Sequence, residues 1–236
     1  MNGQKFWNWQ TNKSTNDSGI EVEEKILFLN GVIAEDSWID DIITPKIFKD
    51  ELIKNQGDIT VWINSPGGDC IAAAQIYNML KEHSGNITIK VDGIAASAAS
   101  VIAMAGDKIL MSPTSLMMIH NPLTMVMGDS SEMKKAIQML SEVKESIINA
   151  YELKTNLSRT KISNLMDVET WLNANKAVEL GFADELMYKS DNKSDEGMMF
   201  AKNNMAKTLI NKINKSSSGN SKPIEDFYKR LNLINK

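Results

Sequence analysis

The sequence has few of the residues that build disulfides and metal centres. It contains one cysteine, Cys70, and two histidines among 236 residues. A single cysteine excludes an internal disulfide and a cysteine-rich metal site, and it fits a reducing compartment. Long apolar runs are also missing, because the longest small or apolar stretch, 94–106, falls short of the roughly 20 residues of a membrane-spanning helix. The polar start MNGQKFWNWQ has no apolar signal segment behind it, so we expect a soluble intracellular protein.

A strong excess of charge of one sign is missing as well. The formal net charge is −4, which gives no general argument for binding nucleic acid, while 42% hydrophobic residues are enough to bury a core. The charge is nevertheless uneven, because residues 189–236 carry ten Lys or Arg and five Asp or Glu. This basic C-terminal tail contains the linker-like SSSGNSKP at 216–223, followed by apolar residues at helical spacing. We expect it either to pack on its own domain or to dock on another protein.

The rest of the chain is expected to form two parts. Residues 1–20 are predicted as a flexible N-terminal arm, whose FWNW aromatics cap the core or dock on a neighbouring subunit. Residues 21–188 alternate β-branched runs with amphipathic stretches, which predicts an α/β domain with mostly parallel strands. The expected strands are 25–33, 59–65, 87–93, KILMSP and SLMMIHNP, and the expected helices are about 45–55, 69–83, 95–105, 130–156, 159–166 and 174–181.

Residues 91–106, VDGIAASAASVIAMAG, place two serines among small side chains. Ser97 stands near the start of an expected helix, after a strand and Gly93. The free N–H groups of a first helical turn and the positive end of the helix dipole favour a developing oxyanion there. The same small side chains are also typical of close helix packing, which is the interpretation that we give to Ser100, one turn further on. From these residues alone, Ser97 is either a nucleophile or a packing residue.

The two histidines have different settings. His83 follows a helix beside a turn, where a solvated side chain that interacts with the helix dipole is expected. His120 ends the apolar strand LMMIH, and Asn121–Pro122 breaks the strand immediately after it. A histidine at a strand end is often structural. If the protein is a serine hydrolase, however, His120 is the general base that this sequence offers.

The loop NSPGGD, residues 64–69, lies between a buried strand and a helix. Its proline stiffens the turn, and Gly67 and Gly68 permit positive φ angles and close backbone approach. The loop could aim the Gly68 amide at a substrate carbonyl, form a tight turn, or cradle a phosphate. It matches neither the P-loop pattern nor the G-x-G-x-x-G dinucleotide fingerprint.

Three blocks in this order, INSPGG, GIAAS and MMIHNP, resemble the proteolytic subunit of the Clp protease. The resemblance covers about residues 25–187 and includes the late block WLNANKAVELGFADEL. It implies the ClpP/crotonase-like α/β fold, with repeated β-β-α units and a protruding long helix, the handle, at about 130–156. It also implies a serine endopeptidase assembled into rings. The early KFWNW, the ETW segment and the basic tail look most like Clp-related proteases of phages and prophages, which act in head maturation.

The resemblance implies a role for each candidate residue. Ser97 matches the nucleophile and His120 the general base, while the amides of Gly68 and Ala98 match the oxyanion hole. A substrate is expected to lie extended and add a strand beside the glycine loop and the residues after the histidine. The remaining residues expected to line this substrate strand are Gly67, Pro122 and Leu123.

The acid of the triad departs from the family pattern, which has an aspartate before a basic residue, an aromatic residue and Met or Leu. Glu169, in the segment ETWL, occupies this position. A glutamate can orient a histidine, although its longer stem requires a displaced backbone. Asp167, two residues earlier, is the competitor, and we favour Glu169.

The resemblance implies no metal and no organic cofactor. It implies further copies of the chain as partners, in one ring of seven or two stacked rings, and polypeptide substrates such as a phage capsid or scaffold protein in the cytoplasm of a bacterial host. It leaves the use of a Clp ATPase open. Three alternatives remain: a crotonase-type acyl-CoA hydratase or thioesterase, which needs no Ser–His pair, a Ser–Lys relative of the signal-peptide peptidases, and a non-catalytic ring that serves as a scaffold.

Overall fold

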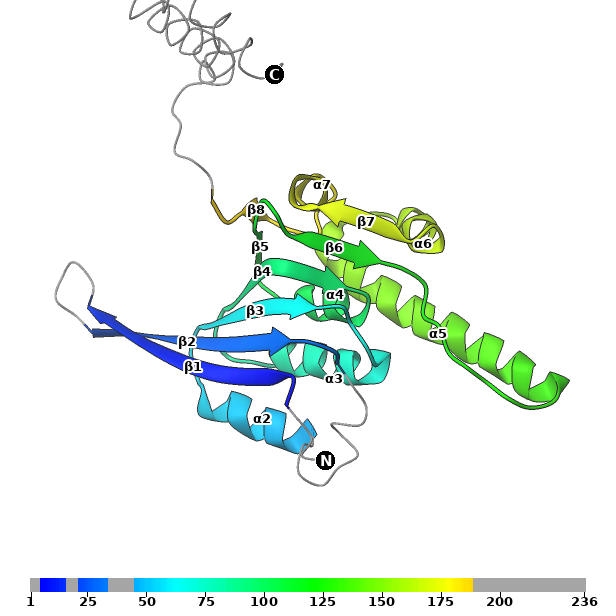
Figure 1. The fold of residues 1–236 in the computed structure, drawn as a ribbon, viewed down its shortest axis with the longest axis horizontal. Helices are drawn as coiled ribbons and strands as arrows, with labels where there is room; N and C mark the ends of the chain where they lie inside the picture. The colour runs from blue at the N-terminus through cyan, green and yellow to red at the C-terminus, as the bar shows by residue number, and fades with distance from the viewer. Residues whose placement is uncertain (1–4, 16–20, 34–44, 189–236) are drawn as a thin grey trace, which may run out of the picture. The chain divides into compact units, whose positions relative to one another are not determined.

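The computed structural model describes residues 5–15, 21–33 and 45–188, and this part of the chain folds around one eight-stranded sheet (Figure 1). Its strands are β1 Trp7–Thr15, β2 Glu21–Asn30, β3 Ile59–Ser65, β4 Ile87–Ala96, β5 Lys108–Met111, β6 Leu116–Ile119, β7 Thr170–Asn173 and β8 Glu185–Leu186. Its helices are α2 Pro45–Lys54, α3 Cys70–Lys81, α4 Ala98–Ala103, α5 Ser130–Thr155, α6 Arg159–Asp167 and α7 Ala174–Glu179. The linker and the helix expected in the basic C-terminal tail lie outside the described residues.

Most neighbouring strands of the sheet run parallel. The order is β1-β2-β3-β4-β5-β8, and β1 is the antiparallel member of this series. Strand β4 is long enough to serve two partners, because its first half pairs with β5 and its C-terminal end pairs with β6. Strand β6 continues to β7 in antiparallel pairing. The expected α/β fold with mostly parallel strands is therefore confirmed.

The core lies between the central strands and the helices that follow them. Ile63 of β3, Ile76 of α3 and Ile102 of α4 are all fully buried. The run ITVWINS has a β-branched residue at most positions and alternates little, as a strand covered on both faces requires. Burial of this apolar surface is the main driving force that holds the helices on the sheet.

Helix starts follow the caps that the sequence offers. Asp129 accepts hydrogen bonds from the amides of Ser131 and Glu132 and opens α5, as expected. Asn173 caps α7 through the Lys176 amide. These carboxylate and amide oxygens satisfy N–H groups that have no partner inside the helix.

The polar N-terminal segment is more ordered than its composition suggests. Residues 7–15, which we expected within a flexible arm, form β1 and pair with β2 along its length. Trp7 is 3% exposed and packs edge-on against Phe48 of α2, with ring centroids 5.3 Å apart. Glu51 of α2 accepts hydrogen bonds from the Trp7 indole at 2.8 Å and from Lys5 at 2.6 Å. Trp7 thus packs into the core of its own domain.

The boundary between β4 and α4 also differs from expectation. The helix begins at Ala98 rather than Ala95. Ala95 and Ala96 remain in β4 because they pair with Met117 and Met118 of β6. Alanine favours helix locally, but the pairing of the sheet overrides this weak preference.

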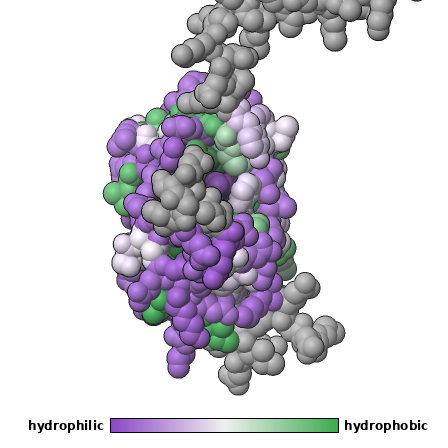
Figure 2. Space-filling view, turned by 90° about the vertical axis from the view of Figure 1, so that its left-hand side faces the viewer, coloured by the Kyte–Doolittle hydropathy of each residue, from purple (hydrophilic) through white to green (hydrophobic). Residues whose placement is uncertain are grey.

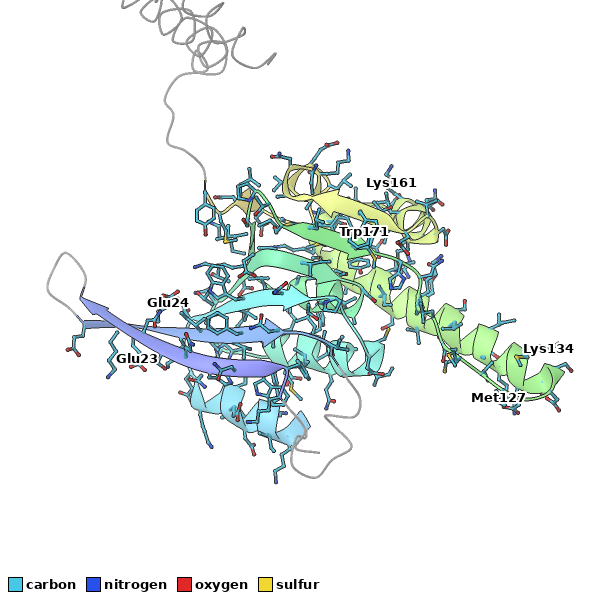
Figure 3. All side chains as sticks on the ribbon, in the orientation of Figure 1. Glu23, Glu24, Met127, Lys134, Lys161 and Trp171 are labelled. Atoms are coloured by element: carbon cyan, nitrogen blue, oxygen red, sulfur yellow. The ribbon has the colours of Figure 1, made fainter. Side chains whose placement is uncertain are left out.

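Helix α5, the longest of the described helices, is buried only near its C-terminus and projects beyond the sheet at the other end (Figure 1). Met127 and Lys134 lie at this projecting end (Figure 3), and Met125 and Met127 in the segment before α5 are 97% and 95% exposed. At the opposite side of the molecule, the surface is largely hydrophilic (Figure 2), and Glu23 and Glu24 of β2 are exposed there. No helix among the described residues is both long and apolar enough to cross a membrane.

Candidate active site

Ser97 sits at a sharp turn between β4 and α4. Its φ of 54° and ψ of −126° are unusual for a residue with a side chain. Its amide donates to the Met118 carbonyl oxygen of β6 at 2.9 Å, and its own carbonyl accepts from the Ser100 amide at 3.0 Å. Its side chain makes no capping hydrogen bond to α4. A strained turn from strand to helix that presents a hydroxyl is the geometry of a nucleophile elbow.

His120 lies beside this hydroxyl. Its Nε2 is 2.7 Å from Ser97 Oγ, which is within hydrogen-bonding distance. The sheet brings the two residues together, because Ala96 of β4 is in register with Met118 of β6. Ser97 directly follows Ala96, the last paired residue of β4, and His120 directly follows Ile119, the last residue of β6. The sequence separation of 23 residues is thus closed by strand pairing.

The glycine loop packs directly against the Ser97 turn. A Cβ on Gly67 would lie 2.6 Å from the Ala96 carbonyl oxygen, 2.7 Å from Ser97 Cβ and 2.9 Å from the Ala98 nitrogen. Gly67 also has a φ of +97°, which side chains rarely adopt. Glycine is therefore required here for both space and backbone conformation.

Two backbone amides near Ser97 remain available. Ile33 hydrogen bonds to Gly67 and Asp69 on either side of Gly68, so the N–H of Gly68 itself points away from Ile33. Ala98 is the first residue of α4, where an amide has no acceptor inside the helix. In the described part of the chain, neither amide donates a hydrogen bond. Such amides can stabilise an oxyanion that forms near the serine.

The sequence of the chain matches one known family over this fold. The model of the Clp protease family matches residues 10–190, which is more than three quarters of the chain. The chain belongs to the Clp protease family. Membership makes the protein a serine-type peptidase, and a mixed α/β fold with helices around a sheet agrees with it.

Individual relatives extend over the same region. An ATP-dependent Clp protease proteolytic subunit from Carsonella ruddii is 29% identical over 170 residues, which cover 71% of this chain and 86% of that protein. The subunit of the same name from Bacteroides fragilis is 29% identical over 168 residues, covering 70% and 80%. The ATP-dependent Clp protease proteolytic subunit 1 of Chlamydia muridarum is 28% identical over 171 residues, covering 71% and 88%.

In this Clp-family chain, the two candidate acids both hydrogen bond to groups other than His120. Glu169, with a φ of 49°, is exposed and accepts a hydrogen bond from the Trp171 indole at 3.1 Å. Asp167 accepts from Lys144 at 2.6 Å and from the Asn121 side-chain amide at 2.9 Å. Within the described residues, neither carboxylate hydrogen bonds to His120.

Asp167 is held more firmly than Glu169, because it has two close hydrogen-bond partners. Its hydrogen bond with Lys144 and, second, that with Asn121 hold the pKa of its carboxyl below the usual value. The side-chain amide oxygen of Asn121, Oδ1, is buried and has no hydrogen-bond partner in the described structure. The sequence gives no signal for this Lys144–Asp167–Asn121 group, because Lys144 comes from α5, 23 residues away from Asp167.

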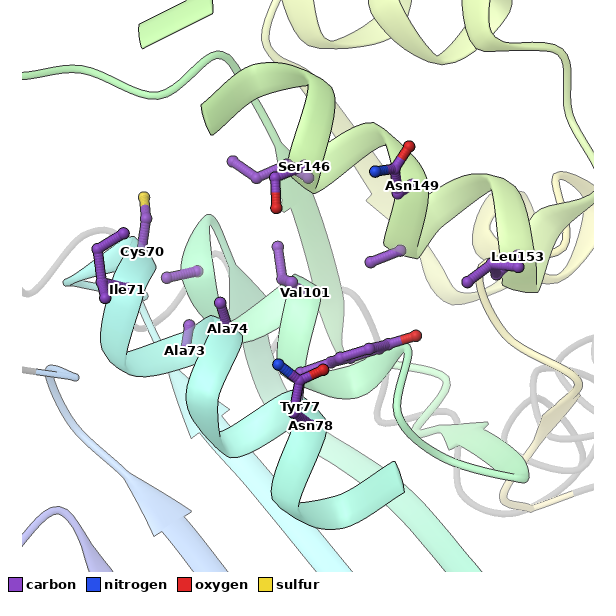
Figure 4. A pocket seen from close by; sticks show the side chains of 13 residues that line it. Cys70, Ile71, Ala73, Ala74, Tyr77, Asn78, Val101, Ser146, Asn149 and Leu153 are labelled. Carbon is purple, nitrogen blue, oxygen red and sulfur yellow. The ribbon is translucent and has the colours of Figure 1, made fainter. Parts of the chain in front are cut away.

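A cavity of about 220 Å³ opens beside the turn, between α3, α4 and α5 (Figure 4). Its walls include Cys70 at the start of α3, Ala98 and Val101 of α4, and Ser146 and Leu153 of α5. Burial raises the pKa of the Cys70 thiol, which therefore stays protonated near neutrality. Ala98, which lines this cavity, directly follows Ser97 in the chain.

The segment after His120 runs through Pro122 and Leu123 without regular secondary structure as far as residue 127. Leu123 is 77% exposed. Among the described residues, no cluster of three or more His, Cys, Asp or Glu could hold a metal ion.

Proposed function

We propose that this protein is a serine endopeptidase in which Ser97 is the nucleophile and His120 the general base. The observation that carries the proposal is the 2.7 Å contact between Ser97 Oγ and His120 Nε2. His120 takes the Ser97 proton as Oγ attacks a peptide carbonyl carbon. The amides of Gly68 and Ala98 hold the resulting oxyanion. His120 then gives the proton to the leaving amine. In the second half of the reaction, His120 takes a proton from water as the water attacks the acyl-enzyme, and it returns this proton to Ser97 Oγ when the acid product leaves.

Glu169 is the group that we propose to orient His120. Asp167 is tied to Lys144 and Asn121. Within the described residues, the Glu169 carboxylate accepts a hydrogen bond only from the exposed Trp171 indole, and this bond costs little to exchange. A carboxylate behind a catalytic histidine stabilises the imidazolium that forms during proton transfer. A rotation of the Glu169 side chain toward the histidine is therefore part of the proposal.

The substrate is proposed to lie extended between the glycine loop and the segment that contains Pro122 and Leu123. That segment has no sheet partner in the described structure, so its backbone can pair with an added strand. A cavity of similar size, about 150 Å³, accommodates benzene in another protein. The cavity at Cys70 and Ala98, about 220 Å³, is thus large enough for an aromatic or branched apolar side chain next to the cleaved bond.

A fluorophosphonate probe tests the peptidase assignment. The wild-type chain should be labelled at Ser97, as located by mass spectrometry, and should cleave a fluorogenic peptide. Ser97→Ala should abolish both, and His120→Ala should lower the labelling rate by at least about 100-fold. Labelling elsewhere, or turnover of acyl-CoA without labelling, would instead support a crotonase-type hydratase or thioesterase. A scaffold without catalytic activity would show neither reaction.

Self-assembly into rings of seven is proposed from family membership and from exposed apolar side chains at the projecting end of α5. Met125, Met127 and Ile137 are 97%, 95% and 68% exposed, and burial between copies would remove them from water. An ATPase partner is proposed because the relatives are named ATP-dependent. Mass photometry of the purified chain should show the mass of seven or fourteen copies. A monomer at micromolar concentration would refute the ring.

The biological substrate is proposed to be a capsid or scaffold protein of a phage, in the cytoplasm of a bacterial host. Support comes from the ETW segment and from the basic C-terminal tail, which can attract an acidic polypeptide. Deletion of 216–236 should keep cleavage of small peptides but slow cleavage of an acidic scaffold protein, and high salt should slow the full-length chain in the same way. Equal cleavage of the scaffold by both forms would refute the role of the tail.

A further inference from the structure

A chain of buried hydroxyl groups joins the long helix α5 to the backbone of Ser97. Ser100 Oγ lies 2.5 Å from the Ser97 carbonyl oxygen and 2.8 Å from the Tyr151 hydroxyl of α5. The side chains are enclosed, since Ser100 is 0% and Tyr151 1% exposed. Ser100 and Tyr151 are 51 residues apart, so only the packing of α5 on α4 makes the contact.

The direction of these hydrogen bonds follows from the atoms involved. A carbonyl oxygen can only accept, so the Ser100 hydroxyl donates its single proton to Ser97. The Tyr151 hydroxyl must then donate to Ser100 Oγ. Burial raises the pKa of Tyr151, which keeps this phenol protonated and able to donate. The chain of hydroxyls therefore runs from Tyr151 through Ser100 to Ser97.

The last acceptor in this chain of hydroxyls is the backbone carbonyl of Ser97, whose conformation has to be stabilised by its neighbours. Ser97 has an unfavourable backbone conformation, which persists only where surrounding contacts determine it. Met118 fixes the Ser97 amide, while the amide and the hydroxyl of Ser100 fix the Ser97 carbonyl. Hydrogen bonds therefore fix both the amide and the carbonyl of Ser97.

The Ser97 carbonyl and the Ala98 N–H belong to the same peptide unit. This unit is planar and trans, so its C=O and N–H point in opposite directions. When Ser100 holds the carbonyl toward the interior, the Ala98 N–H is turned the other way. Any movement of the carbonyl would therefore turn the amide that we assign to the oxyanion hole.

We propose that Ser100 and Tyr151 are positioning residues, which fix the peptide plane between Ser97 and Ala98 and make its orientation depend on the position of α5. The inference rests on the proposed serine peptidase function. Neither hydroxyl touches the substrate. Loss of either one should therefore affect the chemical step and leave substrate binding largely intact.

Tyr151→Phe and Ser100→Ala test this role, because each removes a hydroxyl with little change in shape. Each should lower kcat for a fluorogenic peptide by about tenfold, with KM within about twofold of wild type. The double variant should match Ser100→Ala alone, because the Tyr151 hydroxyl has no acceptor once Ser100 Oγ is gone. Rates are expressed per site titrated by the fluorophosphonate probe, so that unfolded chains do not count.

Ser115→Ala is the matched control. Ser115 is 1% exposed, and its amide and hydroxyl both donate to the Ser112 carbonyl oxygen, at 2.9 and 2.8 Å. It therefore has the same local bonds as Ser100, but they end on a carbonyl outside the site. Its loss should lower the unfolding temperature and leave kcat per titrated site unchanged.

The outcomes separate this inference from the proposed function. If the wild-type chain is labelled at Ser97, but the Ser100 and Tyr151 variants keep the kcat of Ser115→Ala, the positioning role is refuted and the peptidase stands. An additive double variant, or a change confined to KM, also refutes it. If the wild type is neither labelled nor active, the proposed function fails first, and the inference falls with it.

Discussion

The substitution Gly67→Ala tests whether the close approach of the glycine loop to Ser97 is needed for catalysis. The new Cβ would lie 2.6 Å from the Ala96 carbonyl oxygen, whereas ordinary contacts begin at 3.4 Å, so loop and turn must separate by about 0.8 Å. A displacement of about 1 Å at a reacting group can cost about 100-fold in rate, or about 2.7 kcal/mol. The positive φ adds roughly 1–2 kcal/mol of strain to the folded state.

We therefore expect kcat/KM for a fluorogenic peptide to fall about 100-fold in Gly67→Ala, with a similar fall in the rate of probe labelling. Gly57→Ala is the matched control, because Gly57 has a φ of +91° but no atom within 4 Å of the added Cβ. The control should lose roughly 1–2 kcal/mol of unfolding free energy in urea and keep its activity. If Gly67→Ala kept kcat/KM within about threefold of the control, the reasoning from loop contact to rate would be wrong.

Three further predictions concern the acid and the fold. Glu169→Gln should lower kcat at least tenfold while Asp167→Asn stays near wild type in the peptide assay, and the opposite order would assign the role to Asp167. For Glu51, desolvation raises the pKa, but hydrogen bonds with the N-terminal segment outweigh it and hold the pKa below the usual value. Its carboxylate thus stabilises the fold above the unfolded pKa of about 4.3, and this contribution is lost as the pH falls through the lower folded value. Urea unfolding should show a gap between wild type and Glu51→Gln at neutral pH that closes in acid, whereas a constant gap would contradict the linkage. Phe48→Ala should cost about 3–5 kcal/mol in the same measurement, because the ring is fully buried and packs edge-on against Trp7. A loss under about 1 kcal/mol would show that this packing is dispensable.

Features that depend on near neighbours in the sequence were predictable. Asp129 and Asn173 predict helix starts, because the side-chain oxygen of a capping residue accepts hydrogen bonds from amides only two or three residues away. The strand Ile59–Ser65 was predictable with the same bounds, since its β-branched run is bounded by turn residues. Such interactions are settled within a few residues, so the sequence pattern carries them.

Features that depend on pairing partners were not predictable from local preference. The polar residues 7–15 look like an arm, but they become a strand because β2 offers hydrogen bonds along their length. Ala95 and Ala96 favour a helix in isolation, and β6 holds them in a strand. Sheet pairing supplies one or two hydrogen bonds per residue, whereas propensity differences amount to a fraction of a kcal/mol.

For the site, the sequence by itself determined which chemical groups are available: a serine among small residues, one histidine at a strand end, and a loop with two glycines. Only the tertiary structure decided that Ser97 Oγ meets His120 Nε2 at 2.7 Å, that Ser97 adopts a strained turn, and that Asp167 is taken by Lys144. The reason is physical. These contacts join β4 to β6, and α5 to the end of α6, so they exist only after distant segments have packed and their backbone hydrogen bonds have set the register.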